Sequence, residues 1–136
     1  VSLATILLAL VCGGWFVGSP GQERLRKLDE QRVSDLQALA NGVYDVVYKG
    51  LPYDSSTPLS ESLPATVKEV IAKSGVTRVN DPQTGEPYIY RVISSSRFEV
   101  CAVFALPGVH SYDSFWDHSA GEQCFSFDVK NRQHVY

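Results

Sequence analysis

The segment from residue 110 to residue 118 has the highest density of side chains that can do chemistry. Two imidazoles and two carboxylates fall within nine residues: His110, Asp113, Asp117 and His118. Nitrogen and oxygen ligands of these kinds suit zinc or manganese. Their spacing matches no standard metal motif, and such residues in a polar loop are often solvated or bonded to the backbone. We therefore treat the four residues as a candidate ligand or metal site and commit to no cofactor.

The aromatic pair inside this segment, Phe115 and Trp116, has two interpretations. The two rings either form a small recognition patch or cover a sheet, as aromatic residues near a strand usually do.

Motifs of enzyme chemistry are missing from the sequence. It has no Gly-x-Ser-x-Gly nucleophile motif and no glycine-rich phosphate loop followed by a helix. Cys12 stands in an apolar run, where it is not an accessible thiolate. We expect the protein not to be an enzyme.

The composition is that of an ordinary globular protein. The chain has 136 residues, 44% hydrophobic and 20% charged, with 12 Lys+Arg against 15 Asp+Glu and a net charge of −3. This length fits one domain. Without an excess of positive charge to neutralise phosphates, we expect no nucleic-acid partner.

The first 19 residues predict a transmembrane anchor helix. They contain no ionisable group except the thiol of Cys12, and the run VSLATILLALVCGGWFVG would reach roughly 27 Å as a helix, close to the bilayer core of about 30 Å. Trp15 and Phe16 would lie near one membrane interface. The alternatives are a cleaved signal peptide, which Pro20 disfavours, and lipidation at Cys12, which the preceding Leu10-Val11 disfavours.

Two signals disagree about the orientation of this anchor. The basic residues that follow it would place their flank in the cytoplasm under the positive-inside rule; they are Arg24, Arg26, Lys27 and Arg32. Cys101 and Cys124, each in a strand-like segment with aromatic neighbours, are best explained by one disulfide, which needs an oxidising compartment. Two separate buried thiols remain the alternative. We favour a single-pass protein of the inner (cytoplasmic) membrane with residues 20–136 as an extracytoplasmic domain.

An amphipathic helix is predicted to follow the anchor at once. Its apolar stripe repeats every three or four residues apart from one gap of eight, at Leu25, Leu28, Leu36, Leu39, Val43 and Val46/Val47. Arg32 occupies the facing position in that gap. Ser19-Pro20 either begins a fresh helix or kinks one long helix. Gly42 weakens the middle, so the helix is expected to kink or end early there, or else to end at Gly50.

The rest of the chain predicts an α+β fold. A polar connector at 53–62 leads to a short helix from Pro64 to Ser74 that ends at Gly75. Residues 80–87 hold four types of turn-forming residue (Asn, Asp, Pro and Gly) and, apart from proline, no aliphatic or aromatic side chain, which predicts an exposed loop. The period then changes to two, which predicts a hairpin from 88–93 and 98–104 and, after a long loop, a third strand at 124–129.

These elements resemble type IV pilin-like proteins, in particular the pseudopilins of type II secretion. The resemblance is carried by the hydrophobic helix that runs into an amphipathic one and by the turn motif that opens the sheet. The matching turn residues are Asp81, Pro82, Gly85, Pro87, Tyr88 and Tyr90, with one extra residue between Pro82 and Gly85. The fold implied is an N-terminal transmembrane helix that continues into an amphipathic helix packed on a small antiparallel sheet. Pro20 also has a counterpart in the kink-forming proline of pilins.

The resemblance also bears on partners and ions. Related pseudopilins bind calcium through oxygen ligands in a loop near the sheet; Asp113, Asp117 and Asp128 could contribute such ligands here, although a dedicated calcium loop has more acidic residues. Pilin-like proteins usually begin with phenylalanine and carry a glutamate a few residues in, where this chain has Val1 and Thr5. Without that carboxylate, we do not carry filament packing over to this chain.

The sequence therefore predicts a non-enzymatic, membrane-anchored pilin-like subunit or an accessory of an envelope, secretion or pilus complex. Its partners would be the membrane and other proteins, in a homo- or hetero-oligomer formed through the anchor helix. The alternative is a membrane-anchored extracytoplasmic domain that binds or senses a ligand or metal through residues 110–118.

Overall fold

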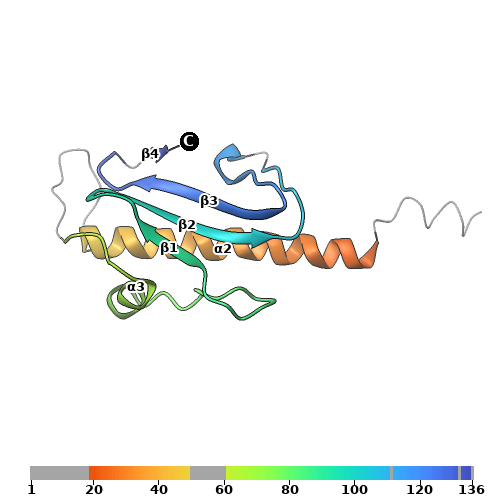
Figure 1. Ribbon diagram of the computed structural model, residues 1–136, viewed down its shortest axis with the longest axis horizontal. Coiled ribbons are helices and arrows are strands. Elements are labelled where there is room, and N and C mark those ends of the chain that lie inside the picture. Colours follow the sequence, from red (N-terminus) through yellow and green to blue (C-terminus); the bar gives the residue numbers. More distant parts are fainter. Residues whose placement is uncertain (1–18, 50–60, 111, 132, 136) are drawn as a thin grey trace, which may run out of the picture.

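The protein folds as one long helix against a small antiparallel sheet (Figure 1). The computed structural model describes residues 19–49, 61–110, 112–131 and, for the backbone alone, 133–135. The elements in chain order are α2 (Pro20–Tyr48), α3 (Val67–Ser74), β1 (Ile89–Val92), β2 (Arg97–Phe104), the 3-10 helix η1 (Ser114–Trp116), β3 (Gly121–Asp128) and β4 (Gln133–Val135). The sheet has the order β1-β2-β3-β4, and every neighbouring pair is antiparallel. The α+β prediction is confirmed at this level.

The described helices do not include a membrane span: none of them is both long enough and apolar enough to cross a bilayer. The transmembrane helix predicted over residues 1–19 falls outside the described residues, apart from Ser19.

Helix α2 begins at Pro20, whose missing N–H costs nothing in the first turn of a helix. Ser19 precedes it and contributes its carbonyl, which accepts the N–H of Glu23 at 3.2 Å, while its side chain makes no capping bond. The predicted apolar stripe is fully buried from Leu36 onward, at Leu36, Leu39, Val43 and Val47, whereas Leu25 and Leu28 are only half-buried. The polar face, with Glu23, Arg24, Lys27, Glu30 and Gln31, is exposed as expected.

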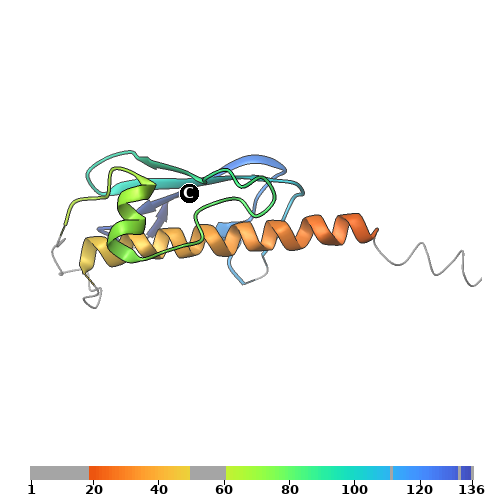
Figure 2. The same cartoon turned by 90° about the horizontal axis from the view of Figure 1, so that it is seen from below.

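The expectation of a kink or early end at Gly42 is wrong, because α2 continues without a break to Tyr48 (Figure 1). The glycine instead permits a close approach of α3, which crosses the C-terminal half of α2 (Figure 2). A Cβ atom at Gly42 would lie 2.9 Å from Ser74 Oγ and 3.3 Å from Val70 Cγ1. The helix ends at Lys49, which takes a left-handed conformation with φ 50°. Gly50, the predicted terminator, lies outside the described residues.

Helix α3 begins three residues later than predicted. Thr66 is its N-cap and accepts the N–H of Glu69, while the Glu69 carboxylate accepts the N–H of Ala65 at 2.8 Å. This Thr-x-x-Glu arrangement satisfies N–H groups that the first turn leaves without partners. Pro64 therefore stands outside the helix, where it is buried and its carbonyl accepts the Tyr90 hydroxyl at 2.7 Å. Gly75 ends the helix as predicted, with φ 74°.

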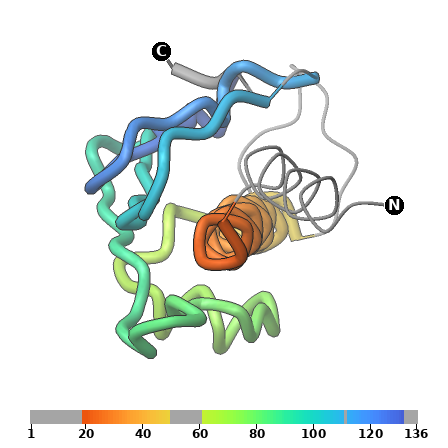
Figure 3. The backbone as a smooth tube through the Cα atoms, turned by 90° about the vertical axis from the view of Figure 1, so that its right-hand side faces the viewer, coloured from red at the N-terminus to blue at the C-terminus, as the bar shows by residue number. Residues whose placement is uncertain are grey.

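The strands alternate between a face that packs on α2 and a face that points away. Inward residues of β2 and β3 are large and buried: Phe98, Val100, Phe104, Phe125 and Phe127. Seen along α2, the sheet covers one side of the helix and α3 covers the adjacent side (Figure 3). The predicted hairpin and third strand are confirmed to within a few residues, whereas β4 was not expected.

The packing at Gly42 makes a testable prediction about stability. Replacement by alanine (Gly42→Ala) raises helix propensity but forces α3 away, and we expect a net loss of about 1 kcal/mol in the free energy of unfolding. Gly21→Ala in the exposed first turn of the same helix is the matched control, since its Cβ would meet only Ser19 Oγ at 3.7 Å. Urea unfolding of both variants checks this, and a gain in stability for Gly42→Ala would contradict the account.

Candidate functional site

His110 and Asp117, two of the predicted site residues, are in direct contact. The Asp117 carboxylate accepts the backbone N–H of His110 at 2.5 Å and lies 3.7 Å from its imidazole Nδ1. Both side chains are about one-third exposed. The Asp117 carboxylate therefore holds the backbone of its own loop and also lies beside the His110 imidazole.

Asp113 serves the backbone of η1. Its side chain caps this short helix by accepting the N–H of Phe115 at 3.0 Å. The cap turns Phe115 and Trp116 onto the sheet, where both are buried against Phe125 and Phe127. Of the two interpretations of the aromatic pair, covering the sheet is the correct one.

His118 is buried beneath the same loop. Its ring stacks on Phe104, and its backbone exchanges two hydrogen bonds with Gly108, which has no room for a side chain because a Cβ there would lie 2.3 Å from His118 Nε2. Burial lowers the pKa of His118 below its ordinary value, and the weaker hydrogen bond to the Ser119 carbonyl does not offset this. The imidazole is therefore neutral at pH 7, the form in which histidine binds metal ions.

The predicted metal ligands come together only in part. His110 and His118 lie with their ring centroids 5.8 Å apart, while Asp113 is bonded to the helix η1. Asp128, the third predicted calcium ligand, pairs with Arg97 at 3.7 Å and accepts the N–H of Lys130. Metal binding at these residues stays a prediction.

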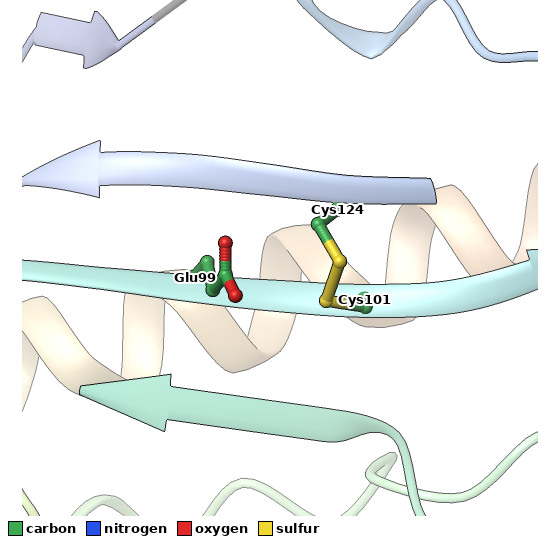
Figure 4. A group of neighbouring side chains, drawn as sticks. All are labelled: Glu99, Cys101 and Cys124. Atoms are coloured by element: carbon green, nitrogen blue, oxygen red, sulfur yellow. A yellow bond between two sulfur atoms is a disulfide. The ribbon is translucent and has the colours of Figure 1, made fainter. Parts of the chain in front are cut away.

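One group of potential ligand atoms does meet in the described part of the chain. It consists of Glu99, Cys101 and Cys124, whose ligand atoms lie within 4.8 Å of one another (Figure 4). The two cysteines are a directly opposed pair of β2 and β3 and are joined in a disulfide, as predicted. A disulfide offers no thiolate, so this group does not form a metal site in the oxidised protein.

A cavity of about 510 Å³ separates the N-terminal half of α2 from the loop at 106–110. Arg26, Asp29 and Glu30 line it from the helix, His110 lines it from this loop, and His118 lines it from the segment that pairs with Gly108. This cavity is the place where the predicted histidines could meet a small polar ligand, because it combines imidazoles, carboxylates and one guanidinium.

A buried charge network that the sequence analysis did not predict lies beneath the sheet and is centred on Arg32. This guanidinium is only 3% exposed and gives a forked pair of hydrogen bonds to Asp81, from Nε at 2.6 Å and from Nη2 at 3.1 Å. Nη1 donates to Asp29 at 2.7 Å, and Nη2 also reaches the Gln83 side chain at 3.0 Å. Hydrogen bonds from Arg32 to Asp81 raise the pKa of the guanidinium. A charge buried this deeply is stable only with such partners.

Each partner carboxylate extends the network to another segment. Asp29 accepts the N–H groups of Ala105 and Leu106, at 3.0 and 2.8 Å, and so fixes the end of β2 to α2. Asp81 accepts the N–H groups of Gln83 and Thr84, which closes the turn motif. Burial disfavours the ionised form of Asp81, but the bonds from Arg32, Thr84 and Gln83 outweigh it and lower the pKa to about 2.

A second polar contact lies one helical turn further along. Asp35 is 1% exposed, accepts the Tyr88 hydroxyl at 3.0 Å and faces Arg78 at 3.4 Å. Burial raises the pKa of Asp35, and burial together with the hydrogen bond to Asp35 raises that of Tyr88. Tyr88 belongs to the predicted turn motif, so the motif is bonded to α2 at two of its residues, Asp81 and Tyr88.

The prediction of an exposed loop at 80–87 is correct for Pro82 to Pro87 and wrong for Asp81, whose side chain is 11% exposed. Gly85 takes a positive φ of 75°, which glycine adopts without strain, and its N–H donates to the Asp81 carbonyl at 2.9 Å. The sequence had one signal for this site: Arg32 interrupts the apolar stripe on the buried face. Asp29 and Asp35 each lie three residues from Arg32, a spacing that places these polar side chains next to one another on the same side of the helix.

Comparison with protein-family models, with curated proteins and with solved structures found no match for this chain. The resemblance of the turn motif to pilin-like proteins stays a prediction.

The lowered pKa of Asp81 predicts how its contribution to stability depends on pH. Because this pKa is about 2 in the folded protein against 3.8 ordinarily, its ion pair stabilises the fold fully above about pH 5 and progressively less as the pH falls toward 2. We expect Asp81→Asn to lose about 2 kcal/mol at pH 7 and little at pH 2. Denaturant unfolding across this range measures it.

Asp45→Asn is the matched control, since Asp45 is an aspartate exposed on the surface of α2. It should cost little at any pH. A loss at Asp81 that does not shrink in acid would contradict the ion pair.

Proposed function

We propose that this protein is a non-enzymatic, membrane-anchored subunit or accessory of an envelope, secretion or pilus complex, with a pilin-like body. The apolar residues 1–19 would hold it in the inner membrane, and residues 20–136 would form an extracytoplasmic domain. Other proteins would be its partners, through the anchor helix and the exposed loops.

The observation that carries the proposal is the lengthwise packing of α2 on the sheet. The helix is 29 residues long, and its first turns extend beyond the end of the sheet (Figures 1 and 2). Those turns are mostly exposed and carry Arg24, Arg26 and Lys27, directly after the 18-residue apolar run. A helix that leaves its domain toward an uncharged segment suits a membrane-anchored protein.

Two further features support this assignment. The disulfide between Cys101 and Cys124 favours an oxidising compartment for the domain. The turn motif that prompted the pilin-like resemblance is bonded to the long helix at two residues, through Asp81 to Arg32 and through Tyr88 to Asp35. In this arrangement the motif connects α2 to the first strand of the sheet.

The second candidate function is ligand or metal binding at the cavity beside α2. It is supported by the 510 Å³ volume and by the two histidines that line it. This candidate needs the same anchor, but it places the function at His110 and His118 instead of at protein contacts.

Membrane attachment and association test the proposal together. The full chain is expressed in a bacterium, and we expect it in the membrane fraction, resistant to carbonate extraction, because an uncharged stretch of this length partitions into the bilayer. Leu8→Arg, in the middle of that stretch, should move it to the aqueous fraction. Recovery of the unchanged chain in the aqueous fraction would contradict the anchor.

The histidine variant separates the two candidate functions. If the protein works as a subunit, chemical cross-linking of membranes should give the same oligomers for the unchanged chain and for the His110→Ala/His118→Ala variant. If it is a metal-binding domain, zinc titration should show binding that this variant loses. Zinc binding without oligomers would replace the subunit proposal by the second candidate.

A further inference from the structure

The disulfide lies on the side of the sheet that faces away from α2. Cys101 and Cys124 are opposite each other in the ladder (Figure 4). Neighbouring positions along both strands point inward and belong to the aromatic and aliphatic core. Cys101 is fully buried, whereas Cys124 is partly exposed. Cys124 is therefore the residue of the pair that is open to solvent, and we take its sulfur as the one that a thiol attacks.

An arginine on β1 contacts both sulfur atoms. Arg91 Nη2 lies 3.5 Å from Cys101 Sγ and 3.4 Å from Cys124 Sγ. Glu99 holds it there, since its carboxylate pairs with Arg91 Nε at 2.6 Å and leaves the Nη2 end of the guanidinium directed at the sulfurs. A guanidinium beside a sulfur stabilises the thiolate, which is the reactive form in exchange and the form that leaves.

We propose that Cys101–Cys124 is an exchangeable disulfide, reduced by a dithiol that attacks Cys124, with Arg91 stabilising the thiolate released from Cys101. The dithiol's first thiolate forms a bond to Cys124 Sγ as the Sγ–Sγ bond breaks, and the electron pair of that bond stays on Cys101. The dithiol's second thiolate then attacks its own sulfur in the mixed disulfide and releases Cys124. The dithiol is oxidised to a disulfide, and the two protons it loses are balanced by two protons taken up by the cysteines.

We expect the fold to persist when the bond is broken. Strands β2 and β3 stay paired along eight register positions, from Arg97 with Asp128 to Phe104 with Gly121. Their inward side chains pack on α2 through contacts that involve neither sulfur. Reduction therefore changes the outer face of the sheet and leaves the domain folded.

The rate of reduction tests the role of Arg91. The full chain in detergent, with Cys12→Ser so that only this pair reports, is exposed to dithiothreitol at pH 7 without denaturant, and free thiols are alkylated and counted by mass spectrometry. We expect reduction in the native protein and a rate about tenfold lower for Arg91→Gln, because the leaving thiolate loses its partner. Arg91→Lys, which keeps the charge, should fall between them.

Arg97→Gln is the matched control. Arg97 lies on the same outward face of the sheet, on β2, is 51% exposed like Arg91, and pairs with Asp128 instead of the sulfurs. It should leave the rate unchanged. Equal rates for the Arg91→Gln and Arg97→Gln variants would overturn the proposal, as would a disulfide that opens only when the protein is unfolded.

The source of the dithiol is resolved by a second arm with reduced thioredoxin. Reduction by both reagents would assign the exchange to a protein dithiol that reaches Cys124, whereas reduction by dithiothreitol alone would assign it to small thiols. Far-UV circular dichroism of the Cys101→Ser/Cys124→Ser variant should match that of the oxidised protein. Loss of the sheet signal would contradict an exchange that leaves the fold intact.

Discussion

The fold depends on how one buried positive charge is satisfied. Arg32 lies on the face of α2 that packs against the sheet, where a guanidinium without partners would cost several kcal/mol. Asp29 from the same helix and Asp81 from the turn motif supply those partners, and each carboxylate also binds backbone N–H groups of its own neighbourhood. The charge thus fixes three segments to one another: α2, the end of β2 and the turn before β1. Apolar packing alone would set the distance between helix and sheet without setting this register.

The two faces of the sheet therefore make different kinds of contact. The inner face is committed to α2 through Phe98, Phe125 and Phe127, and the loop at 105–118 extends that cover with Phe115 and Trp116. The outer face does not pack on α2, and it carries charged pairs and the disulfide. The residues that look most like a chemical site in the sequence are therefore the ones that hold the loop in place, and His118, stacked on Phe104, is the clearest case. Chemistry at the outer face leaves the core untouched.

Local patterns in the sequence were sufficient for most of the architecture. The 3.6-residue stripe of α2, the period of two in β1 and β2 and the pairing of Cys101 with Cys124 each depend on neighbours in sequence or on one residue type. What could not be predicted depends on contacts between distant segments. Gly42 is a weak point of an isolated helix and a necessity once α3 crosses it, and Asp81 is an ordinary turn residue until Arg32, 49 positions away, is placed beneath it. The start of α3 differs from the prediction because the helix begins after the Thr66 cap and not at Pro64.

The most direct test of this account is a double-mutant cycle between Arg32 and Asp81. Urea unfolding at pH 7 is measured for the unchanged protein, Arg32→Gln, Asp81→Asn and the double variant, and the coupling free energy is taken from the four values. If the buried pair joins the turn to the helix, the two losses should be far from additive, with a coupling of about 2 kcal/mol or more. Additive losses, with a coupling below about 0.5 kcal/mol, would mean that the two residues act independently and that the sheet is held to α2 by apolar packing alone.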